Sequence, residues 1–144
     1  MAFGYACGPE PAGQSCPRAA AGVAPDSPPE AAVLPASHRM RRSRDFSRAV
    51  RNGRRAGRPS LVIHLAPGQV DAQTLVGLVV SKQVGGSVVR HRVARQLRGV
   101  LAGRVRDWPR GKLIVVRALP QAATYSSAQL AADVDRAWSK VRQT

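Results

Sequence analysis

The sequence predicts an α+β domain in which one mostly antiparallel sheet packs against helices as a two-layer sandwich. Apolar residues switch between helical and strand spacing along the chain, in the order α-β-β-α-β-α. A length of 144 residues suffices for one compact domain and a tail. No apolar run approaches the roughly 18 residues that a membrane-spanning helix needs, so we do not expect an integral membrane protein.

The first predicted element is a short amphipathic helix. Ser43 can cap its start, and Gly53 ends it. Phe46, Ala49 and Val50 recur at the spacing that places side chains on one face of a helix. We therefore expect one apolar face and one polar, strongly basic face.

Three strands follow from the apolar pattern. Residues 60–66 alternate, which places Leu61 and His64 on opposite faces of the sheet. Residues 74–80 and 113–118 are nearly continuous apolar runs, which are typical of strands covered on both sides.

Two longer helices complete the predicted fold. Ser87 can cap a helix that extends to about residue 106, and a last helix starts at Ser126 or Ser127. On that last helix we expect Asp133 and Asp135 to be solvated.

The start of the chain differs in composition from the rest. The first 36 residues contain seven of the 11 prolines and carry one basic against three acidic side chains. Such a segment buries too little apolar area to offset the entropy of ordering it. We predict a disordered extension over residues 1–33 and a folded domain over 34–144. Cys7 and Cys16 lie in the extension, and we interpret them as incidental thiols of a cytoplasmic protein.

Positive charge is concentrated in the predicted domain. The whole chain has 23 basic and 8 acidic residues, a net charge of +15, and its last 108 residues carry 22 of the basic and 5 of the acidic ones. A net charge of this size predicts a polyanionic partner, above all a nucleic acid. A membrane surface fits less well, because aromatic residues make up only 4% of the chain.

A basic run over residues 39–58 holds nine arginines and one acid, Asp45. Nine guanidinium groups around a short helix repel one another unless phosphates lie between them. The alternative is a solvated basic face that only keeps the protein in solution. We predict general phosphate contacts from seven of these side chains: Arg41, Arg42, Arg44, Arg48, Arg51, Arg54 and Arg55.

The helix predicted after residue 87 separates apolar from basic side chains. At about 100° per residue, Val93 and Leu97 lie close to Val89 on one face. The opposite face carries a set of hydrogen-bond donors, His91, Arg92, Arg95 and Arg98, with Arg90 at the border. Such a helix can dock on the sheet and present forked donors to phosphates.

The loop before this helix contains Lys82 and the pair Gly85-Gly86. Backbone N–H groups at the start of a helix, with a lysine beside them, can bind a phosphate group. A simple glycine turn without a ligand is an equal alternative. The spacing and the Lys-Ser/Thr ending of a nucleotide-binding loop are missing.

Groups for catalysis or metal binding are sparse. His38, His64 and His91 are scattered without the spacing of metal ligands, and the acids of the domain form no close pair before a strand end. We therefore expect no catalytic residue, no bound metal and no small-molecule substrate in this chain.

Two separated segments carry the most specific pattern. VGLVVSKQVGGSVVRHRVARQLR spans residues 76–98, and LPASHRMRRSRDFSRAVRNGRRAGRPSLVIHL spans residues 34–65. They resemble the S-K-K-x-G-x-A-x-x-R-N-R-x-K-R-x-x-R signature and the L-P-x-x-x-R-L-(R/K)-x-x-x-D-F opening of the bacterial ribonuclease P protein family. The resemblance covers about residues 34–140 with the same order of elements.

This resemblance implies an accessory role in tRNA processing. In that family a large catalytic RNA, with Mg²⁺, removes the 5′ leader from precursor tRNA. The protein binds that RNA and holds the leader in a cleft between a helix and the sheet. The expected partners are therefore the ribonuclease P RNA and precursor tRNA, and the expected fold includes a left-handed crossover around the arginine helix.

The resemblance also assigns roles to single residues. By this resemblance, the residues that contact the catalytic RNA are Lys82, Arg90, His91, Arg92, Arg95 and Arg98. The residues that line the leader cleft are Phe46, Val50 and His64. Gln83, His91 and Ala94 depart from the family's Lys, Asn and Lys, while Val50 and His64 stand where the family often has aromatic residues, so base stacking is expected to be thinner here.

The family commonly opens at the Leu-Pro pair that is here Leu34-Pro35, which predicts that translation starts at Val33. Three alternatives stay open. The chain could be a ribosomal or other structural RNA-binding protein. It could be a DNA-binding regulator, although readout helices usually mix Asn, Gln and Ser with Arg. A protein-only nuclease is opposed by the lack of clustered acids.

Overall fold

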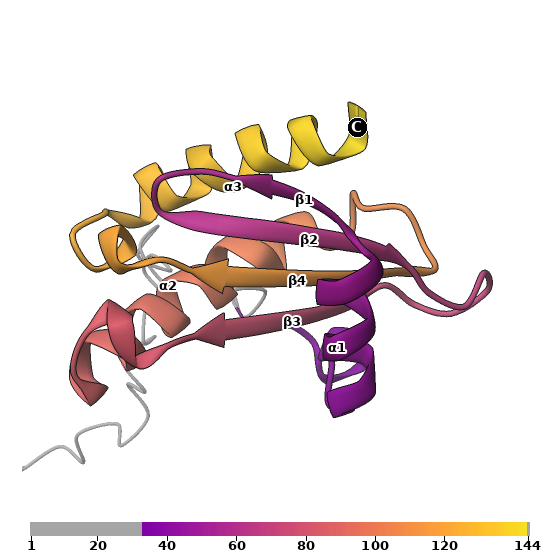
Figure 1. Cartoon of the computed structure of the whole chain (residues 1–144), viewed down its shortest axis with the longest axis horizontal. Coiled ribbons are helices and arrows are strands. Elements are labelled where there is room, and N and C mark those ends of the chain that lie inside the picture. Colours follow the sequence, from indigo (N-terminus) through magenta and orange to yellow (C-terminus); the bar gives the residue numbers. More distant parts are fainter. Residues whose placement is uncertain (1–32, 144) are drawn as a thin grey trace, which may run out of the picture.

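The computed structural model describes residues 33–143, which form a four-stranded sheet and three α-helices (Figure 1). The helices are α1 (Ser43–Asn52), α2 (Ser87–Arg104) and α3 (Ser127–Gln143). The strands are β1 (Arg54–Gly57), β2 (Leu61–Pro67), β3 (Leu75–Val80) and β4 (Lys112–Ala118). Short 3-10 helices are η2 (Ala36–His38), η3 (Lys82–Val84) and η4 (Pro120–Ala123). The predicted α+β class is confirmed.

The extension predicted for residues 1–33 lies, apart from Val33, outside the described residues, and so do Cys7 and Cys16. Leu34, the first residue of the predicted domain, is buried in the core. Within residues 33–143, no helix combines the length and the apolar character needed to cross a membrane.

The sheet is mostly antiparallel, as predicted. Its strand order is β1-β2-β4-β3, with antiparallel pairing of β1 with β2 and of β2 with β4. β3 and β4 pair in parallel and are connected through α2. This connection is the crossover whose left-handedness stays a prediction of the resemblance.

Two details differ from the predicted sandwich. The predicted order lacks β1, because its sequence RRAG is polar and only Ala56 is buried. Pairing with β2, in which Arg55 lies opposite His64, extends this segment despite its composition. In addition, α1 lies on one face of the sheet and α2 with α3 on the other, so α1 adds a partial third layer (Figure 1).

The face that α2 and α3 cover carries the main core. Ile114 from β4, Leu97 from α2 and Leu130 from α3 are fully buried in it. The rings of Trp108 and Trp138 stack at its edge with their centroids 4.6 Å apart. Burial of this continuous apolar cluster is the main source of stability for the fold.

The predicted helix caps are partly correct. α1 and α2 begin at Ser43 and Ser87, but no side chain caps either helix. At the start of α3, Ser126 Oγ accepts a hydrogen bond from the Gln129 N–H (3.3 Å), and Gln129 Oε1 accepts one from the Ser126 N–H (2.9 Å). This reciprocal pair is a capping box, which fixes the start of α3.

Asp133 is not solvated, contrary to the expectation from sequence. Its carboxylate is buried and accepts a hydrogen bond of 2.5 Å from the fully buried Ser60 hydroxyl, which links α3 to the start of β2. Asp135 is exposed and forms a two-point ion pair with Arg104 of α2. The hydrogen bond from Arg104 holds the pKa of Asp135 below its ordinary value.

Candidate nucleic-acid interface

α1 covers only part of its face of the sheet. Ala49, which is fully buried, packs with Ala66 of β2 and with Leu113 and Val115 of β4 in a small second core. Phe46 borders this core and is half-buried. The covered part therefore lies toward one end of the strands.

The neighbouring row on the same face is open. Strand register pairs Arg117 of β4 with Val62 of β2 and with Val79 of β3, so these three side chains form a row across the sheet, which we call the open row. Arg117 is exposed although β4 is a central strand, and the two valines are half-buried. An exposed charge on a central strand shows that no helix covers this row, which faces solvent.

Phe46 lies directly on the sheet at Gly77. A methyl group at Gly77 would come within 2.7 Å of Cζ of the Phe46 ring, closer than real contacts allow. Only glycine therefore lets the ring approach β3 this closely. Val50, one turn further along α1, is 48% exposed and extends the apolar edge of the helix toward solvent.

His64 lies in the row next to the open row. Strand register places it beside Val115, which in turn lies beside Gly77, the residue under the Phe46 ring. His64 is 8% exposed, and its Nδ1 has no hydrogen-bond partner. Burial lowers the pKa of His64 below 6.5, and the positive charges of Arg55 and Arg117 lower it further. The structure thus places Phe46 and His64 over the same face of the sheet, with the His64 ring near the cations Arg55 and Arg117.

The basic face of α2, which comprises Arg90, His91, Arg92, Arg95 and Arg98, points away from the core as predicted. All of these side chains except Arg90 are exposed. Arg90 is half-buried, and its Nε has no hydrogen-bond partner. Arg90, His91 and Arg98 line a groove of about 260 Å³ with Leu78 and Val80 of the neighbouring edge strand β3. Basic donors and an apolar floor therefore meet along this edge of the sheet.

One member of this face is held by the protein itself. Arg92 Nη2 donates a hydrogen bond of 2.7 Å to the carbonyl oxygen of Ala123 in η4. Its guanidinium is therefore positioned before any ligand binds, and part of its donor capacity is used.

The glycine turn before α2 has a clear structural role. Gly85 has a φ of +146°, a backbone conformation that side chains disfavour, and a Cβ there would crowd Val89. Lys82 is exposed in η3, one turn before the helix. The structure supports the turn interpretation, and phosphate binding at this helix start stays a prediction.

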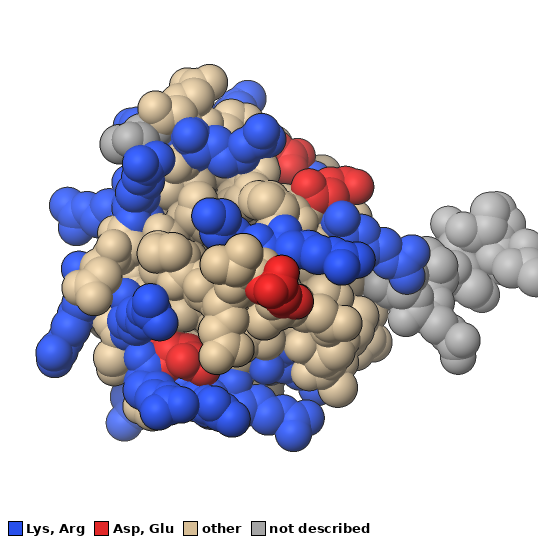
Figure 2. Space-filling view, turned by 90° about the vertical axis from the view of Figure 1, so that its right-hand side faces the viewer, with Lys and Arg blue, Asp and Glu red and all other residues tan. Residues whose placement is uncertain are grey.

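The seven arginines of the run 39–58 that are predicted to contact phosphates divide into two groups. Arg41, Arg42, Arg44 and Arg48 line a cavity at the N-terminal end of α1. Arg51, Arg54 and Arg55 are exposed at the other end of α1 and on β1. Figure 2 shows the end of the molecule that carries α1 and the β2–β3 loop, where basic side chains are spread widely and acidic ones form a few isolated patches.

Carboxylates do not neutralise these two groups. Within residues 33–143, no Asp or Glu oxygen lies within 4 Å of a basic nitrogen of any of the seven arginines predicted to contact phosphates. In the same range, no three His, Cys, Asp or Glu side chains come together as they would around a metal ion. The chemistry available at these surfaces is hydrogen bonding and charge attraction to anions.

Three residues of these surfaces escaped the sequence analysis. Arg117 is the one charged residue within the predicted strand 113–118, and an unexpected charge in a buried strand was the available signal. Gly77, which lies under the Phe46 ring, and Lys112, which lines the cavity at the N-terminal end of α1, gave no such signal, because their roles depend on the elements that the fold brings next to them.

Comparison with known proteins decides the class of this molecule. The family model for ribonuclease P matches residues 34–142. This chain belongs to the ribonuclease P protein family. The ribonuclease P protein component of Streptomyces avermitilis is 50% identical over 117 residues, which cover 76% of this chain and 95% of the relative. That of Beutenbergia cavernae is 53% identical over 103 residues, covering 72% and 87%.

Solved structures support the fold of this ribonuclease P protein. The protein from Staphylococcus aureus aligns with a TM-score of 0.64 at 22% identity, covering 72% of this chain and 96% of that one. The protein from Thermotoga maritima, solved in complex with 1-(4-fluorophenyl)-2-thiourea, aligns with a TM-score of 0.61 at 20% identity, covering 68% and 94%.

Family membership fixes the functional class. As a ribonuclease P protein component, the chain binds RNA and takes part in tRNA processing within an endoribonuclease complex that includes an RNA partner. A ribosomal or other structural role is not favoured, because the matching relatives are ribonuclease P protein components. The roles that the resemblance gives to single residues stay predictions.

Proposed function

We propose that this ribonuclease P protein is the non-catalytic subunit of an RNA enzyme that removes the 5′ leader from precursor tRNA in the cytoplasm. The catalytic RNA carries out bond cleavage and holds the Mg²⁺ that the reaction needs, and the chain binds both RNAs. The observation that carries this proposal is the partly uncovered sheet face beside α1. It places an aromatic ring, a largely buried imidazole and an exposed guanidinium on the same face of the sheet.

This face suits a single-stranded leader. An unpaired base can stack or pack on the exposed edge of Phe46 and beside Val50, because every base has an apolar face. Arg117 and Arg55 then lie where they can bind the phosphates of the same strand, on either side of His64. These contacts need no particular base sequence, which matches a substrate class with varied leaders.

The basic face of α2 suits the catalytic RNA. Its exposed arginines project from a helix whose other face is fixed in the main core, so they are held at defined positions. Arg rather than Lys gives forked contacts to phosphate oxygens. Lys82 lies in η3, just before the N-terminal end of α2, and adds a further cation near that end of the helix.

A cationic protein between two RNAs lowers the barrier to their association. Each RNA carries one negative charge per nucleotide, and Mg²⁺ must otherwise screen their repulsion. A chain with a net charge of +15 replaces part of that screening. We therefore expect this protein to lower the Mg²⁺ concentration at which the catalytic RNA works.

Photo-crosslinking of the leader tests the proposal. Holoenzyme is reconstituted from the chain, a bacterial ribonuclease P RNA and precursor tRNA that carries 4-thiouridine at single leader positions. We expect crosslinks in the peptides that contain Phe46 or His64. Crosslinks confined to α2 would refute the leader assignment. Sedimentation of the chain with ribosomes, without binding to ribonuclease P RNA, would refute the function.

A further inference from the structure

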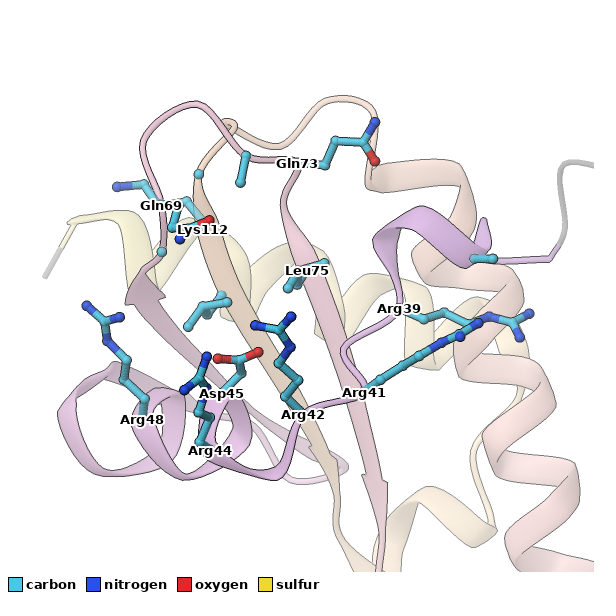
Figure 3. A pocket seen from close by; sticks show the side chains of 15 residues that line it. Arg39, Arg41, Arg42, Arg44, Asp45, Arg48, Gln69, Gln73, Leu75 and Lys112 are labelled. Carbon is cyan, nitrogen blue, oxygen red and sulfur yellow. The ribbon is translucent and has the colours of Figure 1, made fainter.

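A separate cavity of about 750 Å³ lies at the N-terminal end of α1. One wall is formed by Arg42, Arg44 and Arg48, whose side chains rise from the start of α1 (Figure 3). Lys112, at the start of β4, and Gln69, in the β2–β3 loop, line the opposite side. The cavity falls in the size range of sites that enclose a small ligand or one unit of a polymer.

The wall opposite α1 is held rigidly. The Gly68 N–H donates a hydrogen bond of 2.8 Å to the carbonyl oxygen of Gly111, and the Gly111 N–H donates one of 2.9 Å to that of Ala72. Gly111 has a φ of +70°, and a Cβ there would lie 2.7 Å from the Gln69 carbonyl oxygen. Thr74 Oγ1 adds a bond of 2.5 Å to the Pro109 carbonyl oxygen. Two loops distant in sequence are thereby joined into one preformed surface.

Positive charge in the cavity is not balanced. Asp45 is the one acid among the lining residues, and Figure 3 shows it between the arginines. Among the described residues, no carboxylate oxygen lies within 4 Å of the guanidinium groups of Arg42, Arg44 or Arg48. Three guanidinium groups and an ammonium group facing one cavity repel one another until an anion enters.

We propose that this cavity, which we call the α1 pocket, binds a phosphate of an RNA backbone and is a site distinct from the basic face of α2 and from the open row. The forked geometry of guanidinium groups matches phosphate oxygens, and the amides of Gln69 and Gln73 can bond the attached sugar or base. This inference rests on the proposed function.

Two RNAs could supply the phosphate. Arg44 and Val50 are six positions apart, about 9 Å along α1, so a leader strand that crosses the open row could continue into the α1 pocket. The catalytic RNA could instead reach the pocket from outside. Both sources present the same phosphodiester chemistry, and separate binding measurements distinguish them.

The test compares two triple variants with equal loss of charge. The pocket variant carries Arg42→Gln, Arg44→Gln and Arg48→Gln. The matched control carries Arg106→Gln, Arg136→Gln and Arg142→Gln, three exposed arginines on other surfaces. Affinity is measured at several salt concentrations for ribonuclease P RNA alone, and for precursor tRNAs with stepwise shortened leaders on the reconstituted holoenzyme.

We expect the pocket variant to lose about tenfold in affinity for one of the two RNAs relative to the control, with the slope of log K against log salt reduced by about 0.7 per lost phosphate contact. If the leader occupies the pocket, the loss disappears once the leader is too short to reach it. If the catalytic RNA occupies it, the loss appears without any leader.

Equal affinities of the pocket and control variants for both RNAs would overturn the inference. Provided that the wild-type chain activates the catalytic RNA, the proposed function would survive that result. Thermal unfolding checks that the pocket variant folds. If it does not fold, Lys112→Gln on the opposite wall, compared with Arg136→Gln, gives the same test with the same two outcomes.

Discussion

The two faces of the sheet are built in different ways. On the α2 and α3 side, Ile114, Leu97 and Leu130 are fully buried and the tryptophan rings stack. On the α1 side, a small core occupies one end, and the next row leaves Arg117 exposed on a central strand. The first face is a stabilising core, and the second is the face that we propose binds RNA.

Under the proposed function, this difference separates stability from RNA binding within a small chain. Apolar burial on one face provides most of the folding free energy, so the other face can carry charges that repel one another in the free protein. Substitutions on the two faces should therefore affect different measurements.

The largest expected effect lies in the main core. Leu130→Ala removes a fully buried side chain of α3 and should lower the free energy of unfolding by about 2–5 kcal/mol. Val62→Ala, on the half-buried open row, should cost about 1 kcal/mol or less. Denaturant unfolding measures both. A larger loss in the free energy of unfolding for Val62→Ala than for Leu130→Ala would contradict this distinction between the two faces.

The basic face of α2 should affect RNA binding without affecting stability. Arg95→Ala with Arg98→Ala removes two exposed donors, and we expect a loss of about 2–3 kcal/mol in affinity for ribonuclease P RNA, with a shallower salt slope. Arg136→Ala with Arg142→Ala is the control of equal charge. An unchanged salt slope in the first variant would show that these side chains do not contact phosphates.

A substitution at Gly77 should affect both stability and substrate binding. Gly77→Ala forces the Phe46 ring off the sheet, and we expect a loss of about 1–3 kcal/mol in stability together with weaker leader-dependent binding of precursor tRNA. Gly103→Ala in α2, where a Cβ meets nothing within 4 Å, should instead stabilise the protein by about 0.5–1 kcal/mol. Equal losses for substrates with and without a leader would contradict the placement of Phe46 in the leader cleft.

The smallest expected effect is a pH dependence from His64. Its pKa in the folded protein lies below the ordinary 6.5, so the unfolded chain takes up a proton first as the pH falls. The free energy of unfolding should therefore decrease below pH 6.5 and level off once the pH passes below the folded pKa. In a His64→Gln variant this decrease should be absent. Unfolding measured across the pH range would contradict the assignment if both proteins gave the same slope.

The sequence predicted the parts of the fold that depend on local pattern. The apolar spacing of α2 and α3 and the apolar strands β3 and β4 were recognisable because their burial repeats at a fixed period. β1 was missed because its extension depends on pairing with β2 rather than on its own residues. Asp133 was misjudged for a similar reason, since its partner Ser60 lies 73 residues away.

The candidate site was predictable where it rests on a motif and not where it rests on packing. The arginines of α2 follow from helical spacing, and the structure places them on the exposed side. The run of residues 39–58 gave one basic stretch in the sequence, whereas the fold divides it between the α1 pocket and the edge of β1. The α1 pocket also depends on the loops joined at Gly111, which no local pattern indicates.

Reconstitution tests the central claim most directly. The purified chain is added to a bacterial ribonuclease P RNA, and cleavage of precursor tRNA is measured at a Mg²⁺ concentration too low for the RNA alone. We predict that the chain restores cleavage at the 5′ leader junction and that the chain without RNA cleaves nothing. Cleavage by the RNA-free chain, or no gain in activity when the two are mixed, would contradict the account.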